Sequence, residues 1–410
     1  MVKIVIRTLV YLLIALLLVE VFKRLIMRMG FENEYVWVMR GSALQFTLLM
    51  GCLIGLFSWF LLRRFLHSRP LIISNVLIPI LVLTAAEFSI KNLLDHPDKI
   101  PASSLDGFIY YYDHFDARLL QYEKGAMEYD STLFYKFIPA AQIDFINREF
   151  EIQVKANKLG LRDSDAALES PEMIFIGDSH TMGWGVQQDQ AFPALVGTLT
   201  GKKVLNAGIP SFGTARELKL LHLLDTSNLK HLIIQYCSND VEENEKAIGN
   251  GGILEVSSKA AFDSVNNLYK GIRSYFPFKH LSVWGNRAIK LQLSHWVGKK
   301  SVPYGRNPPS MTADLQAAQF IKLLSNAPVD LSRVQITVLN FNHTGAMDSS
   351  FAVSLEHQMK TEEVRLKFPG SVNIVNVYRV LKPADLFILD PHMTAEGHAK
   401  VARELLRFIK

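Results

Sequence analysis

The chain has 410 residues, of which 49% are hydrophobic and 20% are charged, and its formal net charge is +5. This composition excludes a disordered polar chain, a collagen-like chain and a small disulfide-rich domain, and the length leaves room for two or three domains. Residues 1–100 contain 11 Lys or Arg against six Asp or Glu, whereas the rest of the chain contains 33 of each. These basic residues flank apolar runs, which is typical of orientation signals in membrane proteins, and no nucleic-acid partner is expected.

Three apolar runs in this first quarter predict membrane-spanning helices. Residues 41–62 contain no charge and are long enough for a helix to cross a hydrocarbon core of about 30 Å. Residues 70–86 form a second charge-free run, and residues 8–19 form a shorter one. The shorter run is followed by Glu20 without a small-residue cleavage site, which favours an uncleaved span over a signal peptide. We expect residues 1–100 to form a membrane anchor with about three transmembrane helices, in contact with the lipid bilayer.

The charges next to these runs predict the orientation of the chain. Arg63, Arg64 and Arg69 lie in the short connection between the second and third runs, which favours a cytoplasmic turn there. This orientation makes the protein a multi-pass membrane protein, of the bacterial inner membrane, with its soluble domain on the periplasmic side. Four basic residues before the second run would then also lie outside, so the charge count is not uniform. Cys52 and Cys237 both lie in apolar runs and predict no disulfide.

The remaining chain divides into a lead-in and a larger domain. Residues 101–165 are rich in aromatic side chains, and we expect them to pack on the domain that follows or to lie near the lipid surface. Residues 166–410 alternate short apolar runs, typical of buried parallel strands, with helix-like segments. The expected strands are 173–176, 204–205, 232–236, 334–339 and 372–377, and the expected helices are 190–200, 214–224, 312–324, 349–364 and 394–409.

This alternation predicts a three-layer α/β domain with a mostly parallel, five-stranded, flavodoxin-like sheet. Residues 249–309 do not fit the alternation and are treated as an insertion. The insertion interleaves aromatic with basic residues, and we interpret it as a substrate lid or a membrane-facing segment.

Four polar blocks lie where chemistry collects in such a sheet, at the carboxyl ends of strands or just before the last helix. They are Gly177-Asp178-Ser179-His180, Asn206-Ala207-Gly208, Cys237-Ser238-Asn239-Asp240 and Leu389-Asp390-Pro391-His392. Any one of them fits a simple turn, but four in this order indicate an active site. No His/Cys cluster has metal-ligand spacing and no glycine-rich loop suits a phosphate, so neither a metal nor a cofactor is expected.

From about residue 155 to the C-terminus, the constellation resembles the SGNH (GDSL-type) esterase/lipase superfamily. The segment from Asn157 to Arg162 also looks like one that precedes the domain in membrane-tethered members. The resemblance implies that the nucleophile is Ser179, the base is His392 and the residue orienting the base is Asp390. It implies an oxyanion hole formed by Ser179, Gly208 and Asn239. Asp178 and Asp240 are expected to support the site, and the candidate pocket residues are His180 and His343.

These residue types suit acyl transfer. A serine hydroxyl is a poor nucleophile until a base takes its proton, and a neutral imidazole fits that role near neutral pH. Each oxyanion donor is worth about 3–4 kcal/mol in the transition state. Two features depart from the superfamily pattern. Cys237 replaces a glycine, and Asp390 and His392 are two residues apart instead of three. Because of this shorter spacing, a Ser–His dyad without Asp390 remains an alternative to a triad. His398 competes as the base but fits a buried structural histidine in the last helix.

Three functions remain open at this stage. The first is a membrane-anchored serine esterase that cleaves O-acyl esters of an envelope polysaccharide or a lipid through an acyl-enzyme at Ser179. The second is an O-acyltransferase that modifies a cell-envelope polymer within an envelope complex of unknown partners. The third is a degenerate, non-catalytic binding module, which Cys237 and the shifted Asp390 favour.

Overall fold

The computed structural model describes the chain except for a few short segments, and it forms two compact units. The helical unit comprises residues 1–117 and 263–302, and the α/β unit comprises residues 118–262 and 303–410. The described residues are 2–29, 33–296, 311–327, 329–342, 348–368 and 372–409. The division between the units falls inside the expected lead-in, and much of the expected insertion belongs to the helical unit.

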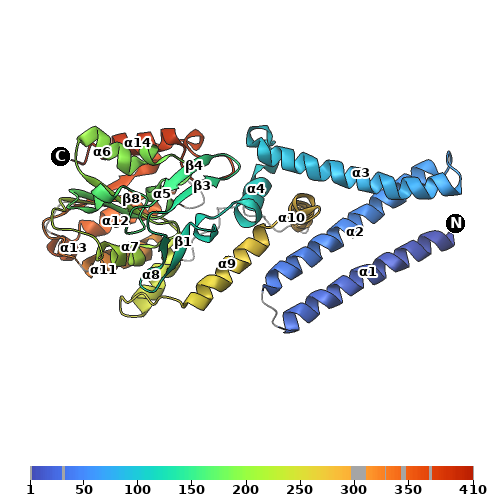
Figure 1. Ribbon diagram of the computed structural model, residues 1–410, viewed down its shortest axis with the longest axis horizontal. Coiled ribbons are helices and arrows are strands. Elements are labelled where there is room, and N and C mark those ends of the chain that lie inside the picture. Colours follow the sequence, from blue (N-terminus) through green and yellow to red (C-terminus); the bar gives the residue numbers. More distant parts are fainter. Residues whose placement is uncertain are drawn as a thin grey trace. The chain divides into compact units, whose positions relative to one another are not determined.

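The helical unit consists of long helices that pack pairwise (Figure 1), α1 on α2 and α2 on α3. Helix α10, from the later part of the chain, packs on α2, α3 and α4. The carboxylate of Glu87 in α3 accepts the backbone N–H groups of His280 (3.3 Å) and Leu281 (2.7 Å), which satisfies two free donors in the first turn of α10. The helices are α1 (Val2–Met29), α2 (Glu34–Leu62), α3 (Ser68–Asp95), η1 (Pro97–Lys99), α4 (Ala102–Tyr111), the π-helical turn η2 (Tyr112–Asp116), α9 (Lys259–Arg273) and α10 (Lys279–Trp296).

The structure corrects the expected number of spans. Within the described residues, two helices are long and apolar enough to cross a membrane, Glu34–Leu62 and Pro70–Asp95, instead of about three. The first helix is long, but the part of it from Val10 onward contains Glu20, Lys23 and Arg24. These charges interrupt every stretch of 18 residues there, so length alone does not make this part of α1 a span.

The α/β unit begins with two antiparallel hairpins that precede the main sheet. Their strands are β1 (Met127–Asp130), β2 (Phe134–Phe137), β3 (Gln142–Ile146) and β4 (Glu151–Lys155). Phe137 and Phe145 are fully buried in the main hydrophobic core, and the Tyr135 hydroxyl donates to the Pro210 carbonyl oxygen at 2.7 Å. The aromatic side chains after residue 118 therefore pack on the α/β core.

The main sheet confirms the predicted parallel, five-stranded architecture. Its strands are β5 (Met173–Gly177), β6 (Val204–Gly208), β7 (His231–Tyr236), β8 (Gln335–Asn340) and β9 (Val372–Asn376), and their order is β6-β5-β7-β8-β9. All neighbouring strands are parallel. The chain leaves β5 toward one edge and returns to pair β7 on the other side of β5. A ligand site is expected at this switch point, at the carboxyl ends of β5 and β7.

Helices cover both faces of this sheet, as Figure 1 shows. Alternate residues of β5 point to opposite faces: Ile174 and Ile176 pack with the core beneath α7, α8, α11 and α12, whereas Met173 and Phe175 pack beneath α6 and α14. The helices are α5 (Ser179–Met182), α6 (Phe192–Thr200), α7 (Thr214–Leu221), α8 (Asp240–Gly249), α11 (Ala313–Ser325), α12 (Ser350–Met359), α13 (Glu362–Lys367) and α14 (Ala395–Leu405). Short 3-10 turns are η3 (Leu120–Tyr122), η4 (Asp165–Leu168), η5 (Gln188–Gln190), η6 (Val377–Arg379) and η7 (Pro383–Asp385).

Candidate active site

The turn between β5 and α5 presents Ser179 at the start of a one-turn helix. The Asp178 carboxylate accepts the backbone N–H of His180 (2.9 Å), and the backbone N–H of Asp178 donates to the Gln235 side chain (2.9 Å). A Cβ atom on Gly177 would lie 2.2 Å from the Thr181 hydroxyl, so the turn can close this tightly only with glycine there. Ser179 itself is half-buried and accessible from the carboxyl edge of the sheet.

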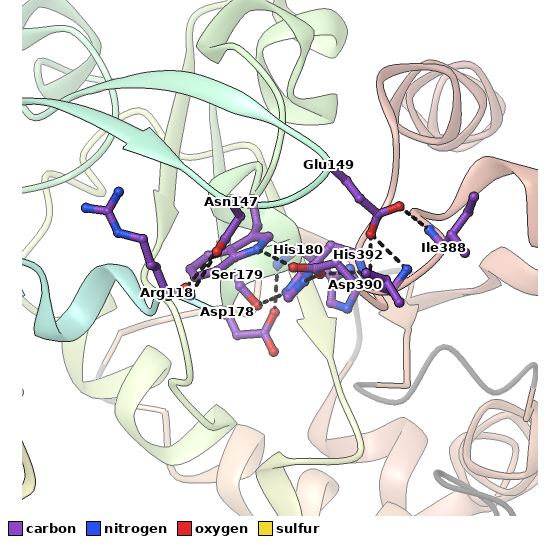
Figure 2. A network of polar contacts seen from close by, with 11 residues as sticks. Arg118, Asn147, Glu149, Asp178, Ser179, His180, Ile388, Asp390 and His392 are labelled. Carbon is purple, nitrogen blue, oxygen red and sulfur yellow. Dashed lines mark hydrogen bonds and ion pairs between the residues drawn. The ribbon is translucent and has the colours of Figure 1, made fainter. Parts of the chain in front are cut away.

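The structure brings Ser179, His392 and Asp390 together in one chain of contacts (Figure 2). The Ser179 Oγ and His392 Nε2 atoms are 2.6 Å apart. On the other side of the ring, His392 Nδ1 contacts Asp390 Oδ1, which also accepts the backbone N–H of His392 at 3.2 Å. The two-residue spacing therefore allows the carboxylate to hold the imidazole, so the geometry is that of a triad rather than a dyad.

Asp390 is buried and remains ionised in this arrangement. Burial by itself raises the pKa of its carboxyl group, but the adjacent His392 and the hydrogen bonds from His392 and Trp184 outweigh burial and hold this pKa below its ordinary value. The Trp184 indole N–H donates to Asp390 Oδ2 at 3.1 Å, so both carboxylate oxygens are engaged. A negative charge beside His392 Nδ1 favours the tautomer that leaves Nε2 free to accept a proton.

Glu149 is a residue of the site that sequence reasoning missed. It lies in the turn of the β3–β4 hairpin, and its carboxylate accepts three consecutive backbone N–H groups, those of Ile388 (2.6 Å), Leu389 (2.8 Å) and Asp390 (3.0 Å), as Figure 2 shows. The loop that carries Asp390 is thus attached to a hairpin about 240 residues away in the sequence. A single acidic residue in a turn has no sequence signal for such a contact.

The same hairpin turn is attached at its other side. The Asn147 side chain accepts the backbone N–H of Arg118 (2.8 Å) and donates to the Arg118 carbonyl oxygen (3.1 Å). Since both groups of the amide are used, the turn is held on one side by Arg118 and on the other by the loop at Asp390. Burial raises the pKa of Glu149, although its three backbone hydrogen bonds oppose this shift.

The expected oxyanion residues lie at the same edge of the sheet. The Asn239 side-chain amide donates to Asp178 Oδ2 at 3.3 Å and keeps a second N–H. The backbone N–H of Gly208 donates to Asn206 Oδ1 at 3.0 Å, so an oxyanion would have to share or replace this contact. The absence of a side chain at Gly208 has a packing reason, because a Cβ there would lie 2.3 Å from the Met182 nitrogen.

The supporting and pocket residues have separate roles. Asp240 Oδ2 accepts the Thr214 hydroxyl (2.8 Å) and backbone N–H (3.2 Å), which holds the start of α7 near the site. The buried His180 ring lies 4.7 Å from the His392 ring and stacks on Phe341. His343, the other candidate pocket residue, lies outside the described residues.

Two further expectations concern Cys237 and His398. The Cys237 side chain, which stands where the superfamily pattern has a glycine, is fully buried in the core beneath α6 and α14. His398 is also buried and accepts the backbone N–H of Phe192 at 3.2 Å. Burial, aided by the charge of Arg162, lowers the pKa of His398 to about 3. These contacts agree with the expectation that His398 is a buried structural histidine and not the base.

A polar cavity of about 640 Å³ adjoins Asn239. Charged and polar side chains dominate its wall, which includes Arg216, Glu242, Glu243, Lys246 and Asn250. Arg216 and Glu243 form an ion pair there, and the cavity lies beside the expected oxyanion donor. This surface suits a ligand with many hydroxyl groups better than a bare acyl chain.

The fold and the site define an α/β domain with a Ser–His–Asp arrangement at a topological switch point. No protein-family model and no curated protein matches the chain. Among solved structures, the chain is similar to a protein of Desulfitobacterium hafniense DCB-2 that is described as lipolytic and of the G-D-S-L family. The identity is 11%, the TM-score is 0.29, and the match covers 58% of this chain and 98% of that one. This similarity is too low to assign an activity, and the chemistry must come from the geometry of the site.

Proposed function

We propose that this protein is a membrane-anchored serine esterase that cleaves O-acyl esters through an acyl-enzyme at Ser179. The observation that carries the proposal is the contact between Ser179 Oγ and His392 Nε2 at 2.6 Å, with Asp390 on the opposite side of the ring. In this geometry, His392 takes the hydroxyl proton as Oγ attacks the ester carbonyl. The positive charge on the ring is then balanced by Asp390.

The next steps follow from the groups around Ser179. The tetrahedral oxyanion would accept hydrogen bonds from the backbone N–H of Ser179 and from the second side-chain N–H of Asn239. The backbone N–H of Gly208 would be a third donor once its hydrogen bond to Asn206 opens. His392 returns the proton to the leaving alcohol, and the ester oxygen of Ser179 holds the acyl group. A water molecule, deprotonated by the same imidazole, then attacks the acyl carbonyl. As the bond between the acyl carbon and Ser179 Oγ breaks and the acid leaves, the imidazolium returns this proton to Oγ.

The polar cavity beside Asn239 supports an acylated carbohydrate as the substrate. Its ion pair and amide groups would bind sugar hydroxyls on the alcohol side of the ester. The same cavity would admit a sugar acceptor in place of water, which is the acyltransferase alternative. Incubating the enzyme with an acyl donor and a sugar separates the two: free acid alone indicates hydrolysis, and an acylated sugar indicates transfer.

Membrane anchoring is supported by the helical unit. Large apolar side chains are exposed along α2 and α3, among them Phe57 (65%), Ile72 (65%) and Leu81 (66%). Exposed apolar surface of this extent is unfavourable in water and favourable in lipid. We propose that α2 and α3 cross the bacterial inner membrane and that the α/β unit lies on its periplasmic side.

Replacing Ser179 by Ala tests the esterase proposal. Without the Oγ nucleophile, hydrolysis of a short-chain aryl ester should fall by at least about a thousandfold. Labelling by a fluorophosphonate probe should be lost as well, because the probe modifies the same oxygen. A Ser238→Ala variant is the control, since Ser238 is also near the sheet edge but donates to Asn342. Unchanged turnover in the Ser179 variant would show that the nucleophile is misassigned.

A further inference from the structure

The helical unit contains a cavity of about 510 Å³ that the proposed ester chemistry does not use. The start of α2, the end of α4 with η2, and the middle of α10 surround it. Its wall contains apolar, aromatic, polar and basic side chains. The apolar ones include Val38, Met39 and Leu291, the polar ones are Ser42, Ser282 and Asn286, and the basic ones are Arg287 and Lys290. None of its described lining residues is Asp or Glu, so no carboxylate in the wall neutralises the basic side chains.

The Arg287 guanidinium group stacks on an aromatic ring and has a donor atom that is unpaired among the described residues. Its guanidinium carbon lies 3.3 Å from the centroid of the Tyr110 ring, and its Nε atom is buried without a hydrogen-bond partner among the residues that the structure describes. A buried donor without a partner costs free energy. The guanidinium group as a whole is a charged, forked donor that suits an anion in the cavity. Lys290 is three residues further along α10, on the same face of the helix.

Other cations of the same unit are used differently. Lys279 donates to the carbonyl oxygen of Phe115 at 2.7 Å and to that of Arg273 at 2.8 Å. Arg273 in turn donates to the carbonyl oxygen of Asp113 at 3.1 Å. These two side chains hold the π-helical turn in place. The cavity cations, in contrast, line an open space of a size suited to a ligand group.

The position of the cavity along α2 indicates the kind of ligand. Tyr35, Val38 and Met39 lie in the first two turns of α2, immediately before the charge-free stretch that begins at Gly41. In a spanning helix, this is the level at which lipid phosphates lie. A phosphate at this level would pair with basic side chains such as those of Arg287 and Lys290. The apolar wall residues of the cavity would contact the first methylene groups of the same lipid.

We propose that this cavity binds the phosphate headgroup of an anionic membrane lipid, with Arg287 and Lys290 on the phosphate and the apolar wall residues against the first methylene groups of the acyl chains. The proposal rests on the membrane anchoring proposed above and is independent of the chemistry at Ser179. A soluble phosphate ion has the same charge, but it would leave the apolar wall residues of the cavity uncovered.

The test uses the full chain, delipidated in detergent and titrated in native mass spectrometry with short-chain phosphatidylglycerol, phosphatidylcholine or inorganic phosphate. We expect phosphatidylglycerol to bind at least about tenfold more tightly than the other two. Arg287→Gln should weaken its binding about tenfold and Lys290→Gln about threefold. Lys270→Gln is the matched control, because Lys270 is an exposed cation of α9 outside the cavity, and it should change binding less than twofold.

Several results would overturn the proposal. One is equal binding of phosphatidylglycerol and phosphatidylcholine, another is binding of inorganic phosphate as tight as that of the lipid, and a third is unchanged affinity in both cavity variants. Lys290 is exposed, so its variant should fold even if Arg287→Gln does not, and thermal unfolding checks both. Aryl-ester hydrolysis by the same preparations shows separately whether the esterase proposal holds.

Discussion

At the scale of single residues, the contact between Glu149 and the loop of Asp390 supports the site from outside the Ser–His–Asp arrangement. Three backbone N–H groups share one carboxylate, and the third belongs to the residue that orients the imidazole. A charged acceptor strengthens each of these bonds. Glu149 therefore acts on the site through Asp390, as a positioning residue, without contact to the ester itself.

Replacing Glu149 by Gln should lower kcat on an aryl ester about tenfold and leave KM nearly unchanged. The amide retains one acceptor oxygen but loses the charge and the second acceptor, so Asp390 holds His392 less precisely. Steady-state kinetics and the rate of fluorophosphonate labelling measure the effect. Glu151→Gln is the control, since Glu151 is an exposed acid of the same hairpin. Equal kcat in the two variants would contradict a positioning role.

His398 predicts how stability depends on pH. Its pKa is about 3 in the folded protein, below the value of about 6.5 in an unfolded chain, so the unfolded state binds the proton first. The contribution of this group to stability is complete above pH 6.5 and should fall as the pH drops toward 3, by about 1.4 kcal/mol per pH unit. The His398→Gln variant should show a flatter dependence between pH 6.5 and 4 in chemical unfolding. His222→Gln, which removes an exposed ring, should not.

At the scale of elements, Arg162 joins the lead-in to the loop that follows the nucleophile helix. Its guanidinium group is fully buried and donates to the carbonyl oxygens of Met182, Gly183, Val186 and Gln153. Burial lowers the pKa of Arg162 to about 10, which leaves it charged at neutral pH. The planar guanidinium group contacts Gln153 on one side and the loop of residues 182–186 on the other. Its hydrogen bonds to this loop help to fix Trp184 next to Asp390.

The Arg162→Lys variant should therefore destabilise the α/β unit by about 2–4 kcal/mol, because one ammonium group cannot replace the four contacts. Hydrogen exchange of peptides from β5 and α5 during chemical unfolding measures the loss locally. Arg333→Lys is the control, since Arg333 is exposed. If the two variants unfold at the same denaturant concentration, Arg162 does not hold this loop.

At the scale of the whole molecule, sidedness in the membrane is the main prediction. Alkaline phosphatase fusions after Arg28 and Lys99 should be active, and a fusion after Arg69 should be inactive, because the arginines between α2 and α3 favour the cytoplasm. An additional reporter at the N-terminus shows whether α1 crosses the membrane. A cytoplasmic signal after Lys99 would contradict the periplasmic location of the α/β unit.

Much of the α/β unit could be predicted from the sequence because its elements are local patterns. The run 173–176 is apolar on both faces and 232–236 is so except for Gln235, as suits a strand between two helix layers. Both runs form strands of the parallel sheet. The expected helix over residues 349–364 forms as two helices, α12 and α13, separated at Lys360 and Thr361. Among the described residues, two helices instead of about three are long and apolar enough to span, because Glu20, Lys23 and Arg24 interrupt α1.

The sequence by itself determined the succession of strands and helices along the chain and the four polar blocks, because hydrophobic period and turn residues act over short distances. Only the tertiary structure decided which distant groups meet. It placed Glu149 on the Asp390 loop, engaged the Gly208 N–H with Asn206, and joined residues 263–302 to the N-terminal helices. Such contacts depend on how whole elements pack, and no local pattern in one sequence encodes them.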